Sequence, residues 1–365
     1  MPANEPTFAG LLGPAASLGR YFSIVGGLTT LIALAVPASL LASGAPHGRP
    51  DVAQALTSIK SFGLQEFAVL GVLLLAVGVV LHPLQFPFTQ LLEGYWGTSR
   101  PASRAMSRSI EGHVQRYSVL AETARVTNDL ARQQAIRLKR LSSARESAKS
   151  KVHQERIRAV EWEMKAGLAS LHAMSGAADN AMRFYPENAD QMMPTRLGNV
   201  LRRYERLAGA AFGIDAVVAA PYLVQLADDP VRGYVEDARS DLDLAVRMVL
   251  VWASTTVLSV LMLWRYDIWL LVPLVTFMFA YISYRGAVFA AVEYGTALQV
   301  LTTLTRWNLY DALAVRLPRD SESEYPTNLD LTAVLQGFYR KLPYHHKMEP
   351  SGSSLTRKTH WSSRD

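Results

Sequence analysis

Four uncharged, strongly apolar blocks stand out along an otherwise polar chain. They cover residues 21–42, 67–92, 248–264 and 268–284. A helix needs about 20 predominantly apolar residues to cross the hydrocarbon core of a bilayer. The pattern therefore predicts an all-α membrane protein with four transmembrane helices, the last two joined as a tight hairpin through Arg265, Tyr266 and Asp267.

The first block has a second interpretation, as a cleaved signal peptide. The small residues from Ala42 to Ala45 resemble a cleavage site. However, the apolar stretch is longer than the roughly 7–15 residues of a usual signal peptide, and Arg20 is the only positive charge nearby. We therefore expect a helix that is retained in the mature protein.

Two prolines interrupt the end of the second block. Pro83 and Pro87 each remove a backbone donor, so we expect a kink between Leu81 and Phe88. His82 lies beside this kink, where a proton-responsive group could act on a gate. The simpler interpretation of His82 is a solvated side chain at the membrane interface.

The distribution of basic residues predicts the orientation. The segment 44–66 carries only Arg49 and Lys60, and the turn before the fourth block only Arg265. Arginines closely follow the second and fourth blocks, at Arg100, Arg104, Arg108, Arg116, Arg285, Arg306, Arg316 and Arg319. Because loops rich in Lys and Arg stay in the cytoplasm, we expect a multi-pass protein of the inner or plasma membrane with both termini cytoplasmic.

These patterns divide the chain into six ranges. They are an N-terminal cytoplasmic segment (1–20), the first two transmembrane helices (21–97), a basic helical cytoplasmic domain (98–244), the transmembrane hairpin (245–285), a helical extension (286–318) and a C-terminal segment with a disordered tail (319–365).

Helical spacing recurs within the cytoplasmic domain. Apolar residues at three- and four-residue steps predict helices over 110–124 and 157–171, and a third helix that begins at Pro194. The Ser-, Lys- and Arg-rich stretch 137–151 between the first two is either a hairpin turn or solvated helix. Ile214 to Val218 could be a short buried strand. Asp229 and Pro230 start a helix that should continue into the third span, and the fourth span should continue to Val315.

The charge of the chain is concentrated in one place. The net charge is +6, and basic residues outnumber acidic ones about two to one between Arg100 and Lys165. Such a basic face could contact anionic lipid headgroups. Nucleic acid is a poorer partner, because few aromatic residues interleave with the basic ones. A solvated helix face that follows the charge bias is the plainest explanation.

Catalytic motifs do not occur in the sequence. It has no cysteine, no phosphate-binding glycine loop, no nucleophile elbow and no zinc-binding His-Glu-x-x-His pattern, so we expect a non-enzymatic protein without a cofactor or a metal. Glu236, Asp237, Asp241 and Asp243 could bind a divalent cation, but helix capping and hydration explain them as well. Glu293 is the only charge between Gly286 and Thr305, and would matter if it were buried.

Three segments together resemble a group of bacterial multi-pass membrane proteins. They run from Leu84 to Trp96 (with Leu-Leu-Glu-Gly-Tyr-Trp), from Pro194 to Arg202 (Pro-Thr-Arg-Leu-Gly-Asn-Val-Leu-Arg) and from Tyr284 to Gly295. The resemblance implies the membrane architecture and no activity. Glu93 and Arg196 belong to these segments and join His82, Pro83, Pro87 and Glu293 as candidate functional positions.

Three functions fit this architecture. The first is a membrane module in which a cytoplasmic domain senses a partner or ligand and acts on the spans, and this module could be a regulated pore. Small residues such as Gly26, Gly27, Gly71 and Gly78 would let it form a homo-oligomer. The second is a passive anchor that recruits a cytoplasmic protein. The third, a lipid-headgroup enzyme, would depend on the carboxylates near Asp237.

Overall fold

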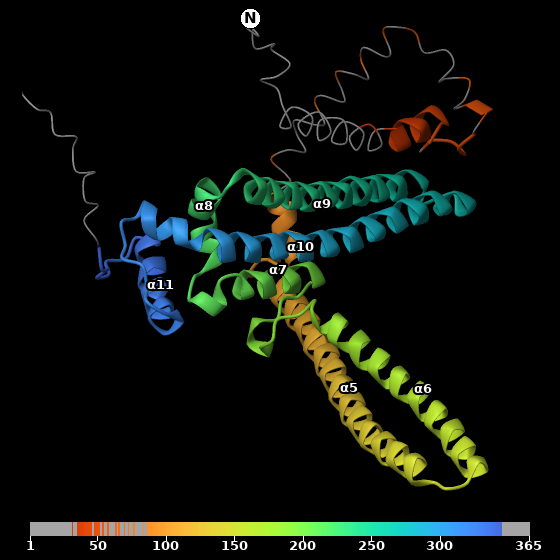
Figure 1. The fold of residues 1–365 in the computed structure, drawn as a ribbon. Coiled ribbons are helices and arrows are strands. Elements are labelled where there is room, and N and C mark those ends of the chain that lie inside the picture. Colours follow the sequence, from red (N-terminus) through yellow and green to blue (C-terminus); the bar gives the residue numbers. More distant parts are fainter. Residues whose placement is uncertain are drawn as a thin grey trace, which may run out of the picture. The chain divides into compact units, whose positions relative to one another are not determined.

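The structure, a computed structural model, describes residues 86–344 throughout, together with 35–45, 47–51 and isolated positions up to Pro83. Within these residues it is helical and contains no strand, which confirms the all-α class. His82, most of the first two predicted spans and the predicted disordered tail lie outside the described residues. The main helices are α5 (Arg100–Ser147), α6 (Lys151–Met182), α7 (Arg196–Leu207), α8 (Ala216–Leu226), α9 (Asp229–Leu263), α10 (Leu271–Ala312) and α11 (Ser321–Leu335) (Figure 1).

The chain forms two compact units. The first contains residues 1–204 and 236–295, and the second contains residues 205–235 and 296–365. The predicted ranges follow membrane topology rather than packing, so they divide the chain differently.

A long antiparallel hairpin of α5 and α6 belongs to the first unit (Figure 1). Ser99 caps α5 by accepting a hydrogen bond from the Ala102 N–H, and α5 continues to Ser147 before a short turn leads into α6. The stretch 137–151 is thus mostly helix with a tight turn at its end. Small buried residues let the two helices approach closely: Ala124, Thr127 and Ala131 on α5, and Ser175 and Ala178 on α6.

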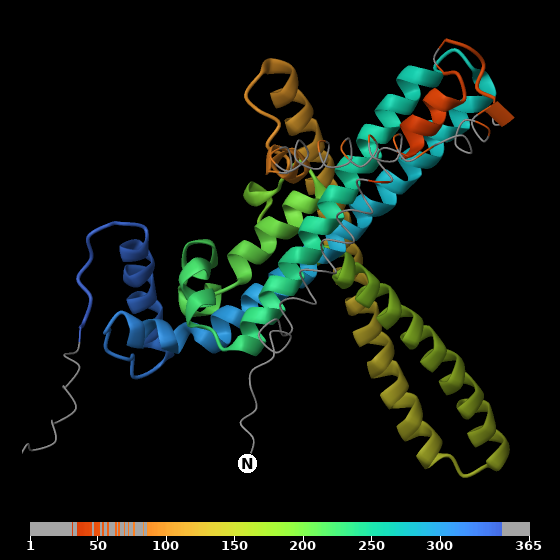
Figure 2. The ribbon, with the colours of Figure 1, turned by 90° about the horizontal axis from the view of Figure 1, so that it is seen from above.

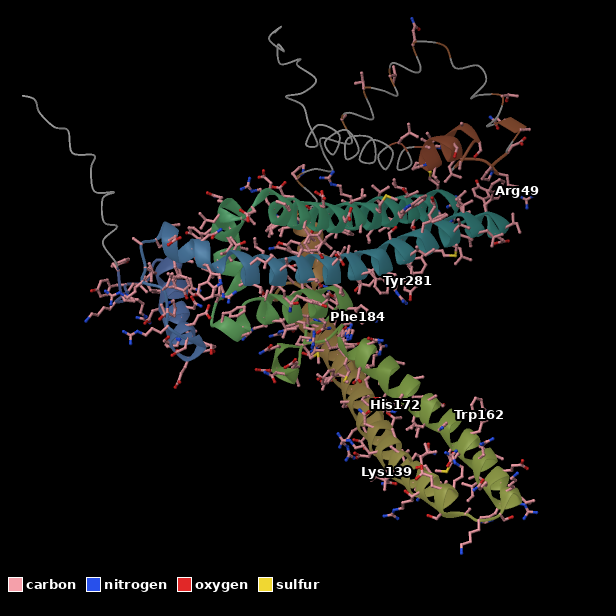
Figure 3. All side chains as sticks on the ribbon, in the orientation of Figure 1. Arg49, Lys139, Trp162, His172, Phe184 and Tyr281 are labelled. Carbon is pink, nitrogen blue, oxygen red and sulfur yellow. The ribbon has the colours of Figure 1, made fainter. Side chains whose placement is uncertain are left out.

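One buried ion pair joins the outer half of the hairpin. The Arg145 Nη1 lies 2.6 Å from the Glu161 Oε2, and the Glu161 side chain is 5% exposed. All other Lys and Arg residues from Arg100 to Lys165 are exposed, among them Lys139 (Figure 3). Their exposure agrees with a solvated basic face, which keeps these charges available to an anionic partner.

The helices α9 and α10 lie side by side and are apolar enough to cross a membrane (Figures 1 and 2). The Thr256 hydroxyl donates to the Thr276 hydroxyl across the pair at 2.9 Å, and Trp252 stacks on Phe279 with ring centroids 4.7 Å apart. The predicted hairpin is confirmed, because α9 ends at Leu263 and a 3-10 turn at Asp267–Leu270 leads into α10. The predicted continuity of both helices beyond their apolar parts is confirmed as well.

The number of spans is not clearly four. Two of the described helices are long and apolar enough to cross a membrane. There are three candidates if the helices Arg196–Phe212 and Ala216–Leu226, which are bent by 71° relative to each other, form one span. The predicted first and second spans fall mostly outside the described residues, which is why they are not among the candidates. Arg202, Arg203 and Arg206 make α7 a poor match to hydrocarbon.

The end of the first apolar block contacts the turn between α9 and α10. Leu40 and Ala45 form a buried cluster with Leu263, and Tyr266 and Trp269 pack against it. Residue 40 and the turn therefore lie on the same side of the first unit.

The second unit holds α8, the end of α10 and α11. The predicted strand from Ile214 to Val218 is wrong. The Asp215 carboxylate instead caps α8 by accepting from the Val217 and Val218 N–H groups, and Pro221 is accommodated inside that helix. The cap and the burial of Ala219 and Leu223 on one helical face outweigh the strand preference of the valines.

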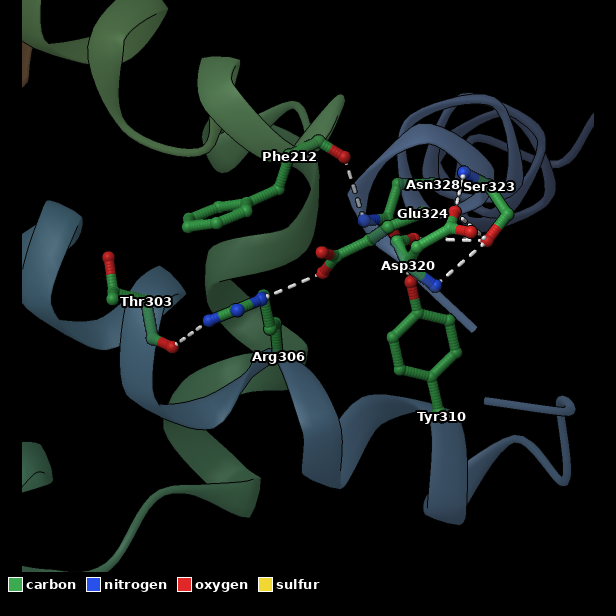
Figure 4. A network of polar contacts seen from close by, with 8 residues as sticks. All are labelled: Phe212, Thr303, Arg306, Tyr310, Asp320, Ser323, Glu324 and Asn328. Carbon is green, nitrogen blue, oxygen red and sulfur yellow. Dashed lines mark hydrogen bonds and ion pairs between the residues drawn. The ribbon is translucent and has the colours of Figure 1, made fainter. Parts of the chain in front are cut away.

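A polar network fixes α11 in this unit (Figure 4). The Arg306 Nε donates to the Glu324 Oε1 at 2.8 Å, and the two side chains are 13% and 6% exposed. The Arg306 guanidinium also lies 4.0 Å from the centre of the Phe212 ring. The buried Tyr310 hydroxyl donates to the Asn328 Oδ1 at 2.6 Å, and the Asn328 amide donates to the Phe212 carbonyl at 2.8 Å.

Candidate functional site

The three segments that carry the family resemblance meet in the first unit. Gly94, with φ of +108°, lies against Pro194, and the Gly198 Cα lies so close to the Glu93 carbonyl that an added Cβ would stand 1.9 Å from its oxygen. The Leu197 N–H donates to the Tyr284 hydroxyl at 3.3 Å. Segments more than 80 residues apart in sequence thus form one packed site.

A buried asparagine holds the loop before α7. Asn199 is fully buried; its Oδ1 accepts from the Met193 N–H, and its amide donates to the Met193 and Thr195 carbonyls, each at 2.8 Å. The Thr195 hydroxyl accepts from the Gly198 N–H at 3.0 Å. Because every polar atom of the Asn199 side chain has a partner, the position of Arg196 at the start of α7 is closely defined.

The apolar face of α7 lies in the core of this unit. Leu197 and Val200 are completely buried and pack with Leu242 and Val246 of α9. The same cluster includes Ala287, Val288 and Ala291 of α10. Thus α7 contacts both of the helices that are apolar enough to span a membrane.

A cavity of about 420 Å³ opens at the base of the α5–α6 hairpin. It is lined by Gln115, Arg116, Val119 and Leu120 of α5, Ala181 of α6, Tyr185, and Arg196 of α7. We call this cavity the basic pocket. It combines two guanidinium groups with an apolar wall, and no carboxylate lines it.

The Arg196 side chain is held in place by an aromatic ring. Its guanidinium carbon lies 4.4 Å from the centre of the Phe184 ring, and Phe184 itself lies at the junction of the hairpin with the rest of the unit (Figure 3). The Arg196 Nε is buried and has no hydrogen-bond partner. Nearby, the Arg203 Nη1 donates to the Tyr185 carbonyl at 2.9 Å. Arg196 is therefore a fixed cation with unused donor capacity.

His113 lies behind the basic pocket, with its ring centroid 5.6 Å from that of Tyr185. Burial, and then the positive charges of Arg116 and Arg196, lower the pKa of His113, although a hydrogen bond to Pro194 acts in the opposite direction. Its Nδ1 is buried without a partner. A lowered pKa favours the neutral imidazole at pH 7, so the charge of the pocket comes from the two arginines.

The structure separates the other candidate positions. Pro83 and Pro87 are exposed and helical, and four residues of the predicted kink, Leu81, His82, Leu84 and Gln85, lie outside the described residues. Glu93 contributes its backbone carbonyl to the contact with Gly198. Glu293 is exposed on α10, so it is not the buried charge that would have marked a functional position. Among the candidate positions that the structure describes, only Arg196 lines the basic pocket.

The acidic residues on α9 do not form a metal site. Among the described residues, no group of three or more His, Asp or Glu side chains is placed to hold an ion. Asp237 and Asp241 are exposed on α9, where capping and hydration account for them.

Sequence reasoning missed Arg116, Tyr185 and His113 as site residues. One signal was available, because His113 falls on the same helical stripe as Ile110 and Tyr117. A histidine on an apolar stripe faces a neighbouring element, here Tyr185. Nothing local distinguishes Arg116 from the other arginines of α5, since only its neighbours from α6 and α7 make it part of a pocket.

Comparisons with models of protein families, with curated proteins and with solved structures found no match to this chain. The resemblance to bacterial multi-pass proteins therefore stays a prediction that rests on the three segments.

Proposed function

We propose that this protein is a non-enzymatic membrane module in which the α5–α6 hairpin and the basic pocket sense a cytoplasmic ligand or partner, and α7 conveys that event to the membrane helices. The contacts of α7 carry the proposal. Its first residue, Arg196, lines the basic pocket, while Leu197 and Val200 pack at zero exposure against α9 and α10. A displacement of α7 at the pocket must therefore be accommodated by α9, by α10 or by both, because packed interiors transmit strain.

The proposal includes the predicted orientation, with the hairpin in the cytoplasm and four spans. Two contacts support it. Leu40 and Ala45 at the end of the first apolar block pack at the α9–α10 turn, and Phe88 and Leu92 at the end of the second block pack beside Ala287. Ala287 lies in the interior of α10, well away from the turn that Leu40 and Ala45 contact, which is consistent with alternating spans.

Cysteine labelling tests the orientation directly, because the chain has no cysteine to remove. Single cysteines replace Ser58, Ser143, Tyr266 and Ser321, and intact cells are treated with a membrane-impermeant maleimide. We expect labelling at positions 58 and 266 and protection at 143 and 321, with labelling after lysis as the control. Labelling of position 143 in intact cells would place the hairpin outside the cytoplasm and end the proposal.

Coupling through α7 can be tested without knowing the ligand. Ala181→Trp fills the basic pocket, and spin labels at Ser254 of α9 and Met278 of α10, both exposed, report the distance between the two helices. We expect the interspin distance to shift by about 2 Å, the size of typical helix displacements in switching proteins. The matched control is Ala169→Trp, which adds the same side chain at an exposed position of α6.

An unchanged distance in Ala181→Trp would argue against coupling and favour the passive anchor. Equal shifts in Ala181→Trp and Ala169→Trp would also contradict the proposal, because the effect would then not originate in the basic pocket.

A further inference from the structure

We infer that the basic pocket binds an anionic group, a phosphate or a carboxylate, that is carried on a ligand with a small apolar or aromatic part. The inference deepens the proposed function and rests on it only for the consequence of binding. Such a group can belong to a free metabolite or to a lipid headgroup. The two sources share the same recognition chemistry.

The charge of the pocket is uncompensated. In the described part of the chain, neither Arg116 nor Arg196 forms an ion pair, although carboxylates pair with Arg125, Arg145, Arg203, Arg232, Arg306 and Arg340 elsewhere. Arg116 is exposed and Arg196 is half-buried, so an anion that enters the cavity can reach both guanidinium groups. Guanidinium groups bind phosphate and carboxylate through paired N–H donors, which makes these anions the best match.

Arg196 is prepared for such a ligand. The Phe184 ring fixes its guanidinium, so little side-chain entropy would be lost on binding. Its buried Nε has no hydrogen-bond partner within the protein, and an unsatisfied buried donor of a charged group is costly. The position of Arg196 at the start of α7 adds the partial positive charge of a helix N-terminus.

The other residues that line the pocket indicate which chemical groups the rest of the ligand carries. Val119, Leu120 and Ala181 offer apolar contacts, and the buried Tyr185, which packs on His113 and Tyr117, closes the wall between the hairpin and α7. The cavity volume of about 420 Å³ lies within the range of small-molecule sites, which is roughly 300–1,000 Å³. An inorganic ion alone would leave these walls unused. The ligand is therefore expected to be amphiphilic.

The test uses the full chain in phosphatidylcholine nanodiscs and phenyl phosphate as the probe. Hydrogen exchange is followed in the peptides around residues 113–120 and 181–196 during a titration. A second arm uses nanodiscs that contain phosphatidic acid, without a soluble probe. We expect protection of both peptides in at least one arm: protection by phenyl phosphate identifies a soluble ligand class, and protection by phosphatidic acid alone identifies a lipid headgroup.

Arginine variants tie the binding to the pocket. Arg116→Gln and Arg196→Gln should each weaken binding about tenfold or more, which corresponds to ~1.4 kcal/mol. Arg132→Gln, on an exposed position of α5, is the matched control and should leave binding unchanged. Because Arg196 also stacks on Phe184, Arg116→Gln decides the outcome if Arg196→Gln fails to fold.

Two results would overturn the inference. One is that neither phenyl phosphate nor phosphatidic acid protects the two peptides from exchange. The other is that Arg132→Gln weakens binding as much as the pocket variants do, which would mean diffuse attraction to the basic hairpin. The spin-label experiment with Ala181→Trp needs no ligand, so it separates the two proposals. If the interspin distance shifts but no anion binds, only the inferred ligand class is rejected. If an anion binds but the interspin distance does not shift, only the coupling through α7 is rejected.

Discussion

Gly198→Ala is expected to lower the free energy of unfolding by about 3 kcal/mol, near the upper end of the usual cost of overpacking. The new methyl carbon would stand 1.9 Å from the Glu93 carbonyl oxygen and 2.9 Å from its carbon. Since both are backbone atoms, no side-chain rotation relieves the clash. Thermal unfolding in detergent, followed by circular dichroism, should show a lower midpoint, and hydrogen exchange should increase at residues 86–94 and 196–204.

Gly112→Ala is the matched control for this variant. An added Cβ at Gly112 meets nothing within 4 Å in the middle of α5. Alanine has a higher helix propensity than glycine, so the variant should be neutral or stabilised by up to about 1 kcal/mol. If Gly198→Ala proved as stable as Gly112→Ala, the close contact of α7 with residue 93 would be wrong, and with it the convergence of the three segments.

Arg306→Ala is expected to release α11 from the second unit. The substitution leaves the Glu324 carboxylate, 6% exposed, without its partner, and it removes the contact with the Phe212 ring. Breaking a buried ion pair from one side typically costs about 3–5 kcal/mol. Hydrogen exchange should therefore rise sharply over Ser321–Leu335, while the peptides of α5 and α6 keep their protection.

Two further variants give this prediction its controls. Arg340→Ala removes an exposed pair with Asp330, 3.5 Å apart, and should cost less than about 0.5 kcal/mol. The double variant Arg306→Met with Glu324→Gln removes both charges and should recover much of the protection, because no buried charge stays unpaired. Normal protection of α11 in Arg306→Ala would show that the ion pair does not hold this helix.

Local pattern was sufficient for the helices. The apolar spacing predicts α7, the continuity of α9 into its apolar half and the extension of α10, and all three are present. The same kind of reasoning failed at Ile214 to Val218, where β-branched residues suggested a strand. There, the cap by Asp215 and the packing of Leu223 decide for helix, and neither is visible in residue preference alone.

The candidate site could be predicted only in part. Arg196 was a candidate because it belongs to one of the three segments that resemble bacterial multi-pass membrane proteins, and it does line the basic pocket. Arg116 and Tyr185 were not, because their role depends on contacts between elements that are distant in sequence. The close approach of Gly198 to Glu93 likewise joins residues about 100 positions apart, and no periodicity within a window reveals such a pair.

The hairpin has a mechanical consequence that follows from its length. From Val119 at the basic pocket to Ser147 at its far end, α5 continues for about 40 Å at 1.5 Å per residue. The hairpin is therefore a lever whose short arm is at the pocket: a rotation of about 5° at the base sweeps its tip through roughly 3.5 Å over that length. If the base is coupled to α7 as proposed, a force applied near Lys149 at the tip would act on the packed base with a mechanical gain.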